Sequence, residues 1–431
     1  MFHTHMLGRS LLVAAVATAL LAPAAGAADY VPDEVVVRYA DAPEAAVVQV
    51  EPGSTVHETA ARLRQRDGVL SATPNFIARA SYIPNDPGPT GTRGGWQDVQ
   101  WNFSGPFGVN APAAWDNVAK AGRPGGSGVI VAVLDTGVAY SDRGRFVRSP
   151  DLRGDRFAHG YDFVDGDRYP SDLNGHGTHV ASTIAEAADN HLALTGLAYG
   201  ATIMPIRVLD RLGEGDSADI AAGIRFAAKH GADVINLSLE FDRRVVASEI
   251  PEILASIRYA HGHGAVIVAA AGNTGQKSLR RVAYPARASE VIAVGATTRH
   301  GCRSEYSSFG ADLDVVAPGG GVDAEPTTPE ETAFCQPESS GDWIYQETFV
   351  GSSVRRFGLP GGYEGTSMAS PHVAGIAALI LATHKLGDHP TPNQVQAHIQ
   401  ATARDLGQAG FDSRYGHGLV DAAAALATSS G

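Results

Sequence analysis

The stretch GTSMASPHVAG, residues 365–375, is followed directly by the apolar run IAALILA, residues 376–382. Glycines and small residues ahead of an unbroken apolar run predict a turn that leads into a buried helix. Ser367 falls at the start of this helix, where free backbone N–H groups and the helix dipole stabilise negative charge. A hydroxyl there suits a nucleophile whose attack creates an oxyanion. On this stretch alone, an ordinary N-cap serine explains the pattern better.

Two further stretches place reactive side chains beside regular elements. Residues 129–137, VIVAVLDTG, predict a buried parallel strand with Asp135 at its carboxyl end, the edge where open α/β sheets place active sites. Residues 174–183, NGHGTHVAST, predict a loop that carries His176 into a small-residue helix. Asp135, His176 and Ser367 therefore occur in one of the three unrelated chain orders known for serine-hydrolase triads.

These three motifs resemble the subtilisin-like serine proteases (subtilases), and the resemblance extends from about Tyr82 to Leu426. It implies an α/β, three-layer subtilisin-like fold with a mostly parallel central sheet. It also implies a serine endopeptidase that works through an acyl-enzyme. In that family Ser367 would attack the scissile carbonyl, His176 would act as base and then as acid, and Asp135 would orient the imidazole.

Between the second and third motifs, apolar runs alternate with helical patterns, which is typical of a parallel sheet. We expect strands at 203–209, 233–239 and 265–270, and helices at 219–230 and 249–261. The third strand leads into AGNTG, where Asn273 resembles the subtilase oxyanion asparagine. Its amide would hold the developing oxygen together with the backbone N–H of Ser367. By itself, an asparagine in this setting is also an ordinary turn residue.

Two short segments resemble the subtilase strands that pair with the substrate backbone, Ser238-Leu239 and Ala271-Gly272. The family usually has two glycines after Ser-Leu, whereas this chain has Glu240 and Phe241. We therefore expect a shifted preference at the residue before the scissile bond. Phe241 would narrow the pocket, and Glu240 would favour a basic or polar side chain.

Calcium is the cofactor that the resemblance to thermitase-like subtilases implies, because this cation takes oxygen ligands. One set of expected ligands is Asp86, Asp151 and Asn190, completed by the carbonyls of Ala187, Leu192 and Leu194. Bound calcium would stabilise the folded chain and take no part in catalysis.

A second expected calcium set is the loop cluster Asp162, Asp165 and Asp167. Close carboxylates repel one another unless a cation or solvent relieves them, so a solvated acidic loop is the alternative. His179 lies one helical turn after His176 but lacks the HExxH pattern of a zinc pair, so we expect a structural histidine.

The N-terminal residues 1–27 predict a secretory signal peptide, with an apolar centre at 11–21 and a small-residue cleavage site. This run is shorter than the ~20 residues that span a membrane. We expect a secreted, extracellular protein without membrane attachment once the signal is removed. Residues 28–80 resemble the subtilase inhibitor pro-peptide, a small α+β pro-domain, although an ordinary N-terminal subdomain is the alternative. The resemblance implies self-cleavage near Ala80 or Ser81, which leaves a catalytic domain at 81–431.

Composition limits the partners and the redox chemistry. The net charge of −13 argues against nucleic acid and anionic membranes, and we expect a monomer that takes protein or peptide substrates. Cys302 and Cys335 are the only cysteines, and they form either one disulfide or two buried thiols. Residues from about 320 to 362 exceed the usual family link and predict a surface insertion.

Two other functions fit parts of the pattern. A catalytically silent subtilase-fold binding or scaffold protein would need a blocked cleft or a retained pro-segment, and all four chemical residues are present. A lipase or esterase would have Gly-x-Ser-x-Gly, but Ala369 stands where the second glycine is required. The sequence therefore predicts a secreted, autoprocessed serine endopeptidase.

Overall fold

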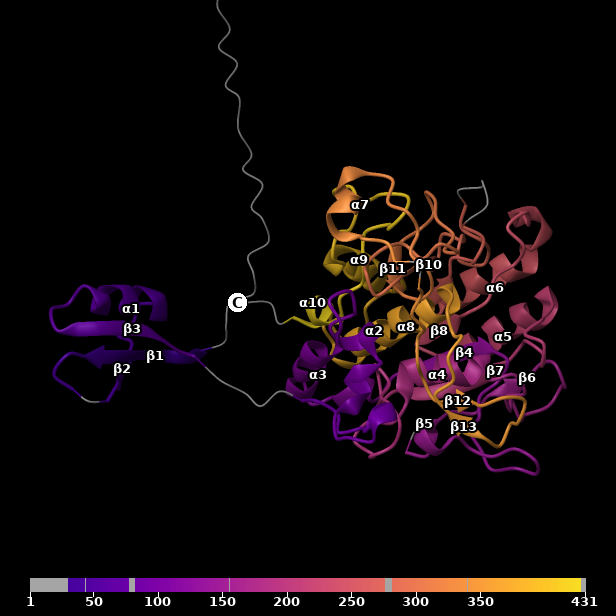
Figure 1. The fold of residues 1–431 in the computed structure, drawn as a ribbon, viewed down its shortest axis with the longest axis horizontal. Helices are drawn as coiled ribbons and strands as arrows, with labels where there is room; N and C mark the ends of the chain where they lie inside the picture. The colour runs from indigo at the N-terminus through magenta and orange to yellow at the C-terminus, as the bar shows by residue number, and fades with distance from the viewer. Residues whose placement is uncertain are drawn as a thin grey trace, which may run out of the picture. The chain divides into compact units, whose positions relative to one another are not determined.

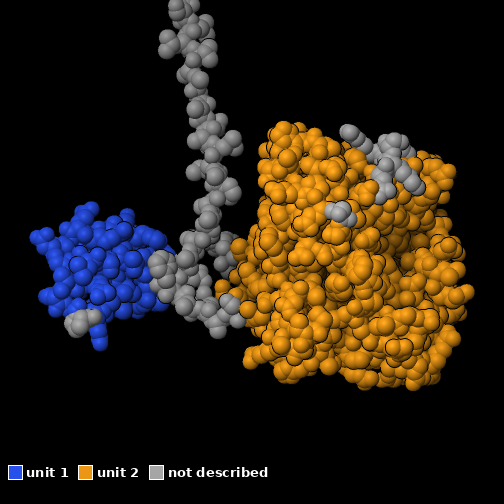
Figure 2. Space-filling view, viewed as in Figure 1, with its two compact units in different colours: residues 1–80, 428–431 blue, residues 81–427 orange. Residues whose placement is uncertain are grey.

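The computed structural model describes residues 30–42, 44–76, 82–154, 156–275, 281–338 and 340–427. The chain divides between Ala80 and Ser81 into two compact units, drawn in blue and orange in Figure 2. This division falls where the sequence places the end of the pro-segment. The predicted signal peptide and the residues around the predicted cleavage point lie outside the described residues, so processing stays a prediction.

The first unit is a small α+β module, as predicted. It contains β1 (Tyr30–Tyr39), β2 (Ala46–Gln49), α1 (Val56–Arg64) and β3 (Val69–Phe76), with the antiparallel strand order β2-β1-β3. Thr55 and Glu58 form a capping box that starts α1. One face of α1 packs on the sheet around a core of its own: Val35, Val37, Val56, Ala60, Leu63 and Ala72.

The second unit is built on a parallel sheet. In the described part of the chain this sheet has eight strands: β4 (Ile130–Asp135), β5 (Arg156–Phe157), β6 (Tyr161–Asp162), β7 (Thr202–Arg207), β8 (Val234–Leu237), β9 (Val266–Ala270), β10 (Val291–Thr297) and β11 (Val315–Pro318). The order is β11-β10-β9-β8-β4-β7-β5, and β6 also pairs with β7. Strands β8 to β11 are buried along their whole length, which explains their continuous apolar runs.

Helices cover both faces of this sheet (Figure 1). The helices of the second unit, in its described part, are α2 (Trp101–Ser104), α3 (Ala111–Lys120), α4 (His176–Ala185), α5 (Ser217–Lys229), α6 (Pro251–Gly262), α7 (Pro329–Phe334), α8 (Thr366–Ala382), α9 (Pro392–Thr402) and α10 (Ala422–Leu426). No helix of the described residues is both long and apolar enough to cross a membrane.

Alternate residues of β4 show how the three layers form. Val131 and Val133 belong to the core beneath α4 and α8, whereas Ala132 and Leu134 belong to the core beneath α5 and α6. This alternation follows from the period of two in a strand, and it gives each face of the sheet its own helical layer. The predicted three-layer fold is therefore confirmed.

Helix α8 is buried along nearly its whole length, because its residues are small or apolar. At Gly375 a Cβ atom would lie 3.1 Å from Leu197, so glycine allows α8 to approach that loop closely. This packing fixes the start of the helix, where Ser367 lies.

The segment at about 320–362, predicted to be a surface insertion, contains α7 and the short hairpin of β12 (Thr348–Phe349) and β13 (Phe357–Gly358). The prediction that it lies on the surface is wrong for its central part. Ile344, Gln346 and Thr348 are fully buried. The carbonyl of Ile344 accepts a hydrogen bond of 2.9 Å from Nε2 of His179, which confirms His179 as a structural histidine of α4. This segment therefore packs against α4 and helps to hold it in place.

Cys302 and Cys335 form a buried disulfide, so the alternative of two free thiols is wrong. The bond joins the loop after β10 to the end of α7. A cross-link between positions 33 residues apart stabilises the fold mainly by restricting the unfolded chain.

Candidate active site

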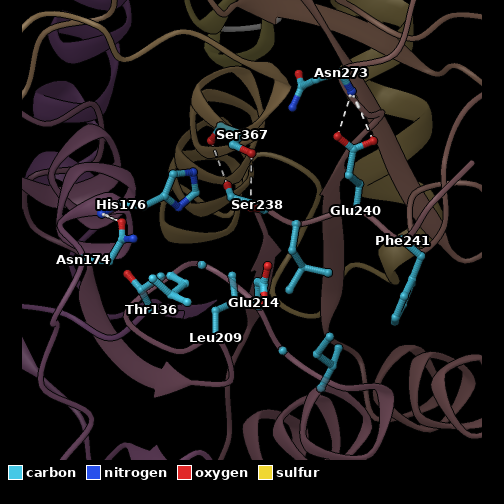
Figure 3. Close-up of a pocket in the computed structure, with 15 residues that line it drawn as sticks. Thr136, Asn174, His176, Leu209, Glu214, Ser238, Glu240, Phe241, Asn273 and Ser367 are labelled. Carbon is cyan, nitrogen blue, oxygen red and sulfur yellow. Dashed lines mark hydrogen bonds between the residues drawn. The ribbon is translucent and has the colours of Figure 1, made fainter.

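Three elements bring the predicted triad to one end of the sheet. Asp135 is the last residue of β4, His176 is the first residue of α4, and Ser367 lies in the first turn of α8. His176, Ser367 and Asn273 line one pocket of about 480 Å³ (Figure 3). The carboxyl edge of a parallel sheet is where such a site is expected.

Asp135 and His176 are joined by a short contact. Oδ1 of Asp135 lies 2.7 Å from Nδ1 of His176, and the carboxylate is fully buried. Burial alone lowers the pKa of His176. The charge and hydrogen bond of Asp135, with the charge of Asp172, outweigh burial and raise this pKa above 6.5. When Nδ1 donates to Asp135, Nε2 of the neutral ring is an acceptor.

The Ser367 hydroxyl is held at the mouth of the pocket. Its Oγ donates to the carbonyl of Ser238 at 3.2 Å, and the Ser238 hydroxyl donates to the Ser367 carbonyl at 2.8 Å. Figure 3 shows this reciprocal pair beside the His176 ring. The end of β8 therefore fixes the first turn of α8.

The Asn273 side chain is oriented by its neighbour on α8. Its Oδ1 accepts hydrogen bonds from the Thr366 backbone N–H at 2.9 Å and from Thr366 Oγ1 at 3.1 Å. With its oxygen engaged in this way, the amide can offer only its NH2 group to a negatively charged oxygen. Asn273 thus fits the predicted oxyanion position.

Glu240 lies on the other side of Asn273. Both of its carboxylate oxygens accept the backbone N–H of Asn273, at 3.0 and 3.2 Å. Burial raises the pKa of Glu240, the hydrogen bonds from Asn273 lower it, and the charge of Asp242 raises it further; the net shift is upward. Oε2 would lie 2.5 Å from a Cβ on Gly272, so the carboxylate occupies space that glycine leaves open.

The structure separates the two predicted substrate segments. Ser238, Leu239 and Glu240 line the pocket, as expected. Ala271 and Gly272 do not line it. The backbone of Ala271 forms hydrogen bonds with Val294 and Ala283, and the backbone of Gly272 forms hydrogen bonds with Thr366 and Ser308. Their backbone N–H and C=O groups are therefore engaged within the protein, and the prediction that they pair with a substrate is not supported.

Several residues that line the pocket had no role assigned from the sequence. They come from the ends of other elements and from the loop between β7 and α5, and they include Thr136, Asn174, Leu209, Glu214 and Ile220. Thr136 and Asn174 stand in the motifs of Asp135 and His176, and Ile220 belongs to the apolar spacing of α5, but the place of Leu209 and Glu214 in the pocket depends on long-range packing.

Asp172 is a further residue that the sequence analysis missed. It is buried, and its carboxylate accepts hydrogen bonds from the backbone N–H groups of Asn174, Gly175 and Thr178 and from the hydroxyls of Thr136 and Thr178. Burial raises its pKa, although these hydrogen bonds lower it in part. An aspartate four residues before His176, in a glycine-containing loop, was the available signal.

The three carboxylates of the acidic loop have partners within the protein. Asp162 and Asp165 each contact Nη1 of Arg207, at 2.8 and 2.7 Å. The Asp167 carboxylate accepts the backbone N–H of Tyr169 instead. The guanidinium already supplies positive charge to two of the three carboxylates, and calcium at this loop stays an untested prediction.

The other expected calcium residues do lie together. Asp86 accepts the backbone N–H of Asn190 at 3.1 Å, and Asn190 Nδ2 donates to Asp151 at 2.5 Å. Both carboxylates are fully buried. Burial raises the pKa of Asp86, and it raises that of Asp151 to about 7. Two buried carboxylates beside an amide suit the oxygen preference of calcium.

A search of the described residues finds no group of three or more His, Cys, Asp or Glu side chains arranged to hold a metal ion. The set of Asp86, Asp151 and Asn190 has only two acidic members. It would depend on the amide and on backbone carbonyls for its remaining ligands.

Comparisons with known proteins agree with this geometry. Residues 126–418 match the model of the subtilase family. The chain is 34% identical over 409 residues to a thermophilic serine proteinase of Bacillus sp. (strain AK1), which covers 90% of this chain and 86% of that protein. It is also 34% identical to thermitase of Thermoactinomyces vulgaris, over 79% of this chain and 98% of thermitase.

A solved structure shows the same fold. A protease from Pseudoalteromonas arctica matches with a TM-score of 0.62 and 31% identity, over 80% of this chain and 99% of that chain. With the family model matched across the sheet and all three triad positions, the chain belongs to the subtilase family and is a serine endopeptidase.

Proposed function

We propose that this chain is a secreted endopeptidase, made as a pro-form, that cleaves proteins or peptides through an acyl-enzyme on Ser367. One observation carries the proposal: the 2.7 Å contact between Asp135 and His176 faces a pocket that also contains Ser367 and Asn273. Acyl transfer requires a group that orients the base, the base itself, a nucleophile and an oxyanion donor, and these four residues would supply them in that order.

Proton transfer follows from the positions of the three side chains. Rotation about the Ser367 Cα–Cβ bond would move Oγ from the Ser238 carbonyl toward Nε2 of His176. His176 then takes the hydroxyl proton as Oγ attacks the carbonyl, and it later gives that proton to the leaving amine. The buried Asp135 carboxylate stabilises the imidazolium that forms between these steps. A water molecule releases the acyl group by the same route in reverse.

The negative charge that develops on the carbonyl oxygen has two donors in reach. One is the Asn273 NH2 group, which Thr366 orients, and the other is the Ser367 backbone N–H at the positive end of α8. Both donors are fixed by packing before substrate arrives. They need no reorganisation when the charge appears.

The first unit would act as the inhibitor of the second until it is cut off near Ala80 or Ser81. The support is its independent core and the division of the chain at that point. Export through the predicted signal peptide would deliver the pro-form outside the cell. A silent scaffold protein would need neither the oriented His176 nor the open pocket.

The first experiment compares the chain without residues 1–27 with the same chain carrying Ser367→Ala. We expect the wild type to shorten to a start near Ser81 and to hydrolyse casein. The variant should stay full length and inert, because it lacks the nucleophile. Mass spectrometry and casein release measure both effects. If both chains stay full length and inactive, the scaffold function replaces this proposal.

Asn273→Ala should lower kcat by about 10²–10³, the loss known for such a donor in subtilisin, a member of this family, and should change KM little. The reason is that the amide stabilises charge present only in the transition state. Steady-state kinetics on a peptide anilide measure the loss. The exposed Asn393→Ala on α9 is the control and should match wild type. A fall below tenfold would remove Asn273 from the oxyanion site.

Activity should depend on the raised pKa of His176. Catalysis needs the neutral ring, so activity is present above this pKa and is lost as the pH falls through it. We expect the acid limb of kcat/KM to have its midpoint above 6.5, the ordinary value for histidine. A midpoint at or below 6.5 would mean that Asp135 and Asp172 do not outweigh burial at His176.

Calcium is proposed at Asp86, Asp151 and Asn190. Cation binding would relieve two buried carboxylates and stabilise the folded state by about 2–3 kcal/mol at ~100 times the Kd. Chelator should therefore lower the Tm of the Ser367→Ala chain, and adding Asp151→Asn should abolish this response.

The matched control for calcium is Asp165→Asn, which should keep the response to chelator because Asp165 already pairs with Arg207. If Asp165→Asn removes the response instead, the acidic loop is the calcium site. If chelator changes no Tm, calcium has no structural role here.

A further inference from the structure

The carboxylate of Glu240 is in direct contact with Asn273, the residue proposed to stabilise the oxyanion. It is anchored through both oxygens on the backbone N–H of that residue (Figure 3). A carboxylate has about four acceptor sites, and the contacts with the single residue Asn273 leave some of them unused. The anchored side chain therefore presents free acceptors at the pocket wall.

The negative charge of this pocket is not balanced by its own lining. A second carboxylate, Glu214, lines the same pocket, and among the described residues that line it there is neither lysine nor arginine. Within the described residues, Glu240 has no ion-pair partner within 4 Å. Arg244, four positions along the chain, is held by Asp242 at 2.9 and 3.1 Å. A cation that enters the pocket would find an unpaired carboxylate.

The position of Glu240 decides which substrate residue it meets. During attack by Ser367, the carbonyl oxygen must reach the Asn273 amide. The residue that supplies this carbonyl lies before the scissile bond, and its side chain starts one bond from the carbonyl carbon. Successive residues of an extended peptide are more than about 3 Å apart along the chain. The side chain nearest to the Asn273–Glu240 contact is therefore that of the residue before the scissile bond.

We propose that Glu240 selects lysine or arginine at the residue before the scissile bond. The inference rests on the proposed function and adds a substrate class to it. A cationic side chain would form a charge-assisted hydrogen bond in a partly desolvated place. Phe241, also in the lining, offers apolar surface for the methylene stem. An apolar side chain would displace water from the carboxylate and offer no hydrogen bond in its place, which costs free energy.

The test uses two peptide anilides that differ only before the scissile bond, one with lysine and one with norleucine. Norleucine keeps the stem and removes the charge, so the ratio of the two kcat/KM values isolates the ammonium group. We expect the processed wild type to prefer lysine by about 10- to 100-fold, the effect of one charge-assisted hydrogen bond. Glu240→Gln keeps the shape but not the charge, and should reduce this ratio to about 1.

The control is Glu252→Gln, an exposed carboxylate on α6 outside the pocket lining, which should keep the wild-type ratio. Raising the salt concentration should lower the wild-type ratio, because salt screens the pair. A companion peptide with alanine tests whether Glu240 instead fills the pocket and leaves room only for small side chains.

Each other outcome overturns the inference in a distinct way. If the wild type cleaves the norleucine peptide as fast as the lysine peptide, Glu240 does not recognise the positive charge of the substrate. A preference for alanine shows that Glu240 blocks the pocket, and an unchanged ratio in Glu240→Gln assigns the selectivity elsewhere. If the processed wild type cleaves none of the peptides, the proposed function fails, and this inference fails with it.

Discussion

The contact between Asp135 and His176 joins the end of β4 to the start of α4. Close backbone packing and buried hydrogen bonds hold the strand and the helix together at this point. The backbone is close enough there that a Cβ on Gly177 would lie 2.1 Å from the Gly137 carbonyl. Asp172 ties the loop before α4 to Thr136, directly after the strand. The 2.7 Å contact is thus the product of a rigid frame around it.

The far end of α4 is held by buried polar groups. Glu186, one residue past the helix, accepts the backbone N–H of Glu347 at 3.2 Å, and Glu347 in turn accepts the backbone N–H of Asp151. Burial, with the charges of Asp151 and Glu347, raises the pKa of Glu186 well above its usual value. Three ionised carboxylates this close together would repel one another, and this repulsion favours the protonated form of Glu186. The central part of the insertion therefore belongs to the framework of the catalytic helix.

The sequence predicted the parts of the site that depend on local pattern. Buried strands have continuous apolar runs, and Asp135, His176 and Ser367 each lie where a strand or helix begins or ends, so their motifs were sufficient. Contacts between distant segments were not visible. Arg207 meets Asp162 and Asp165 across the β6–β7 pair, more than 40 residues along the chain, and no spacing rule joins them. The sequence could not show what the acidic loop, Ala271 and Gly272 contact, because their partners come from other elements.

Asn273 is held through two different groups, one on its side chain and one on its backbone. Its side-chain oxygen is held by Thr366 on α8, and its backbone N–H is held by Glu240 after β8. The orientation of the amide therefore depends on the packing of α8, which is buried and fixed. Glu240 holds the Asn273 backbone from the other side and also lines the pocket. Because Thr366 holds the side-chain oxygen and Glu240 holds the backbone N–H, the pocket wall can carry a carboxylate at position 240 while α8 still orients the Asn273 amide.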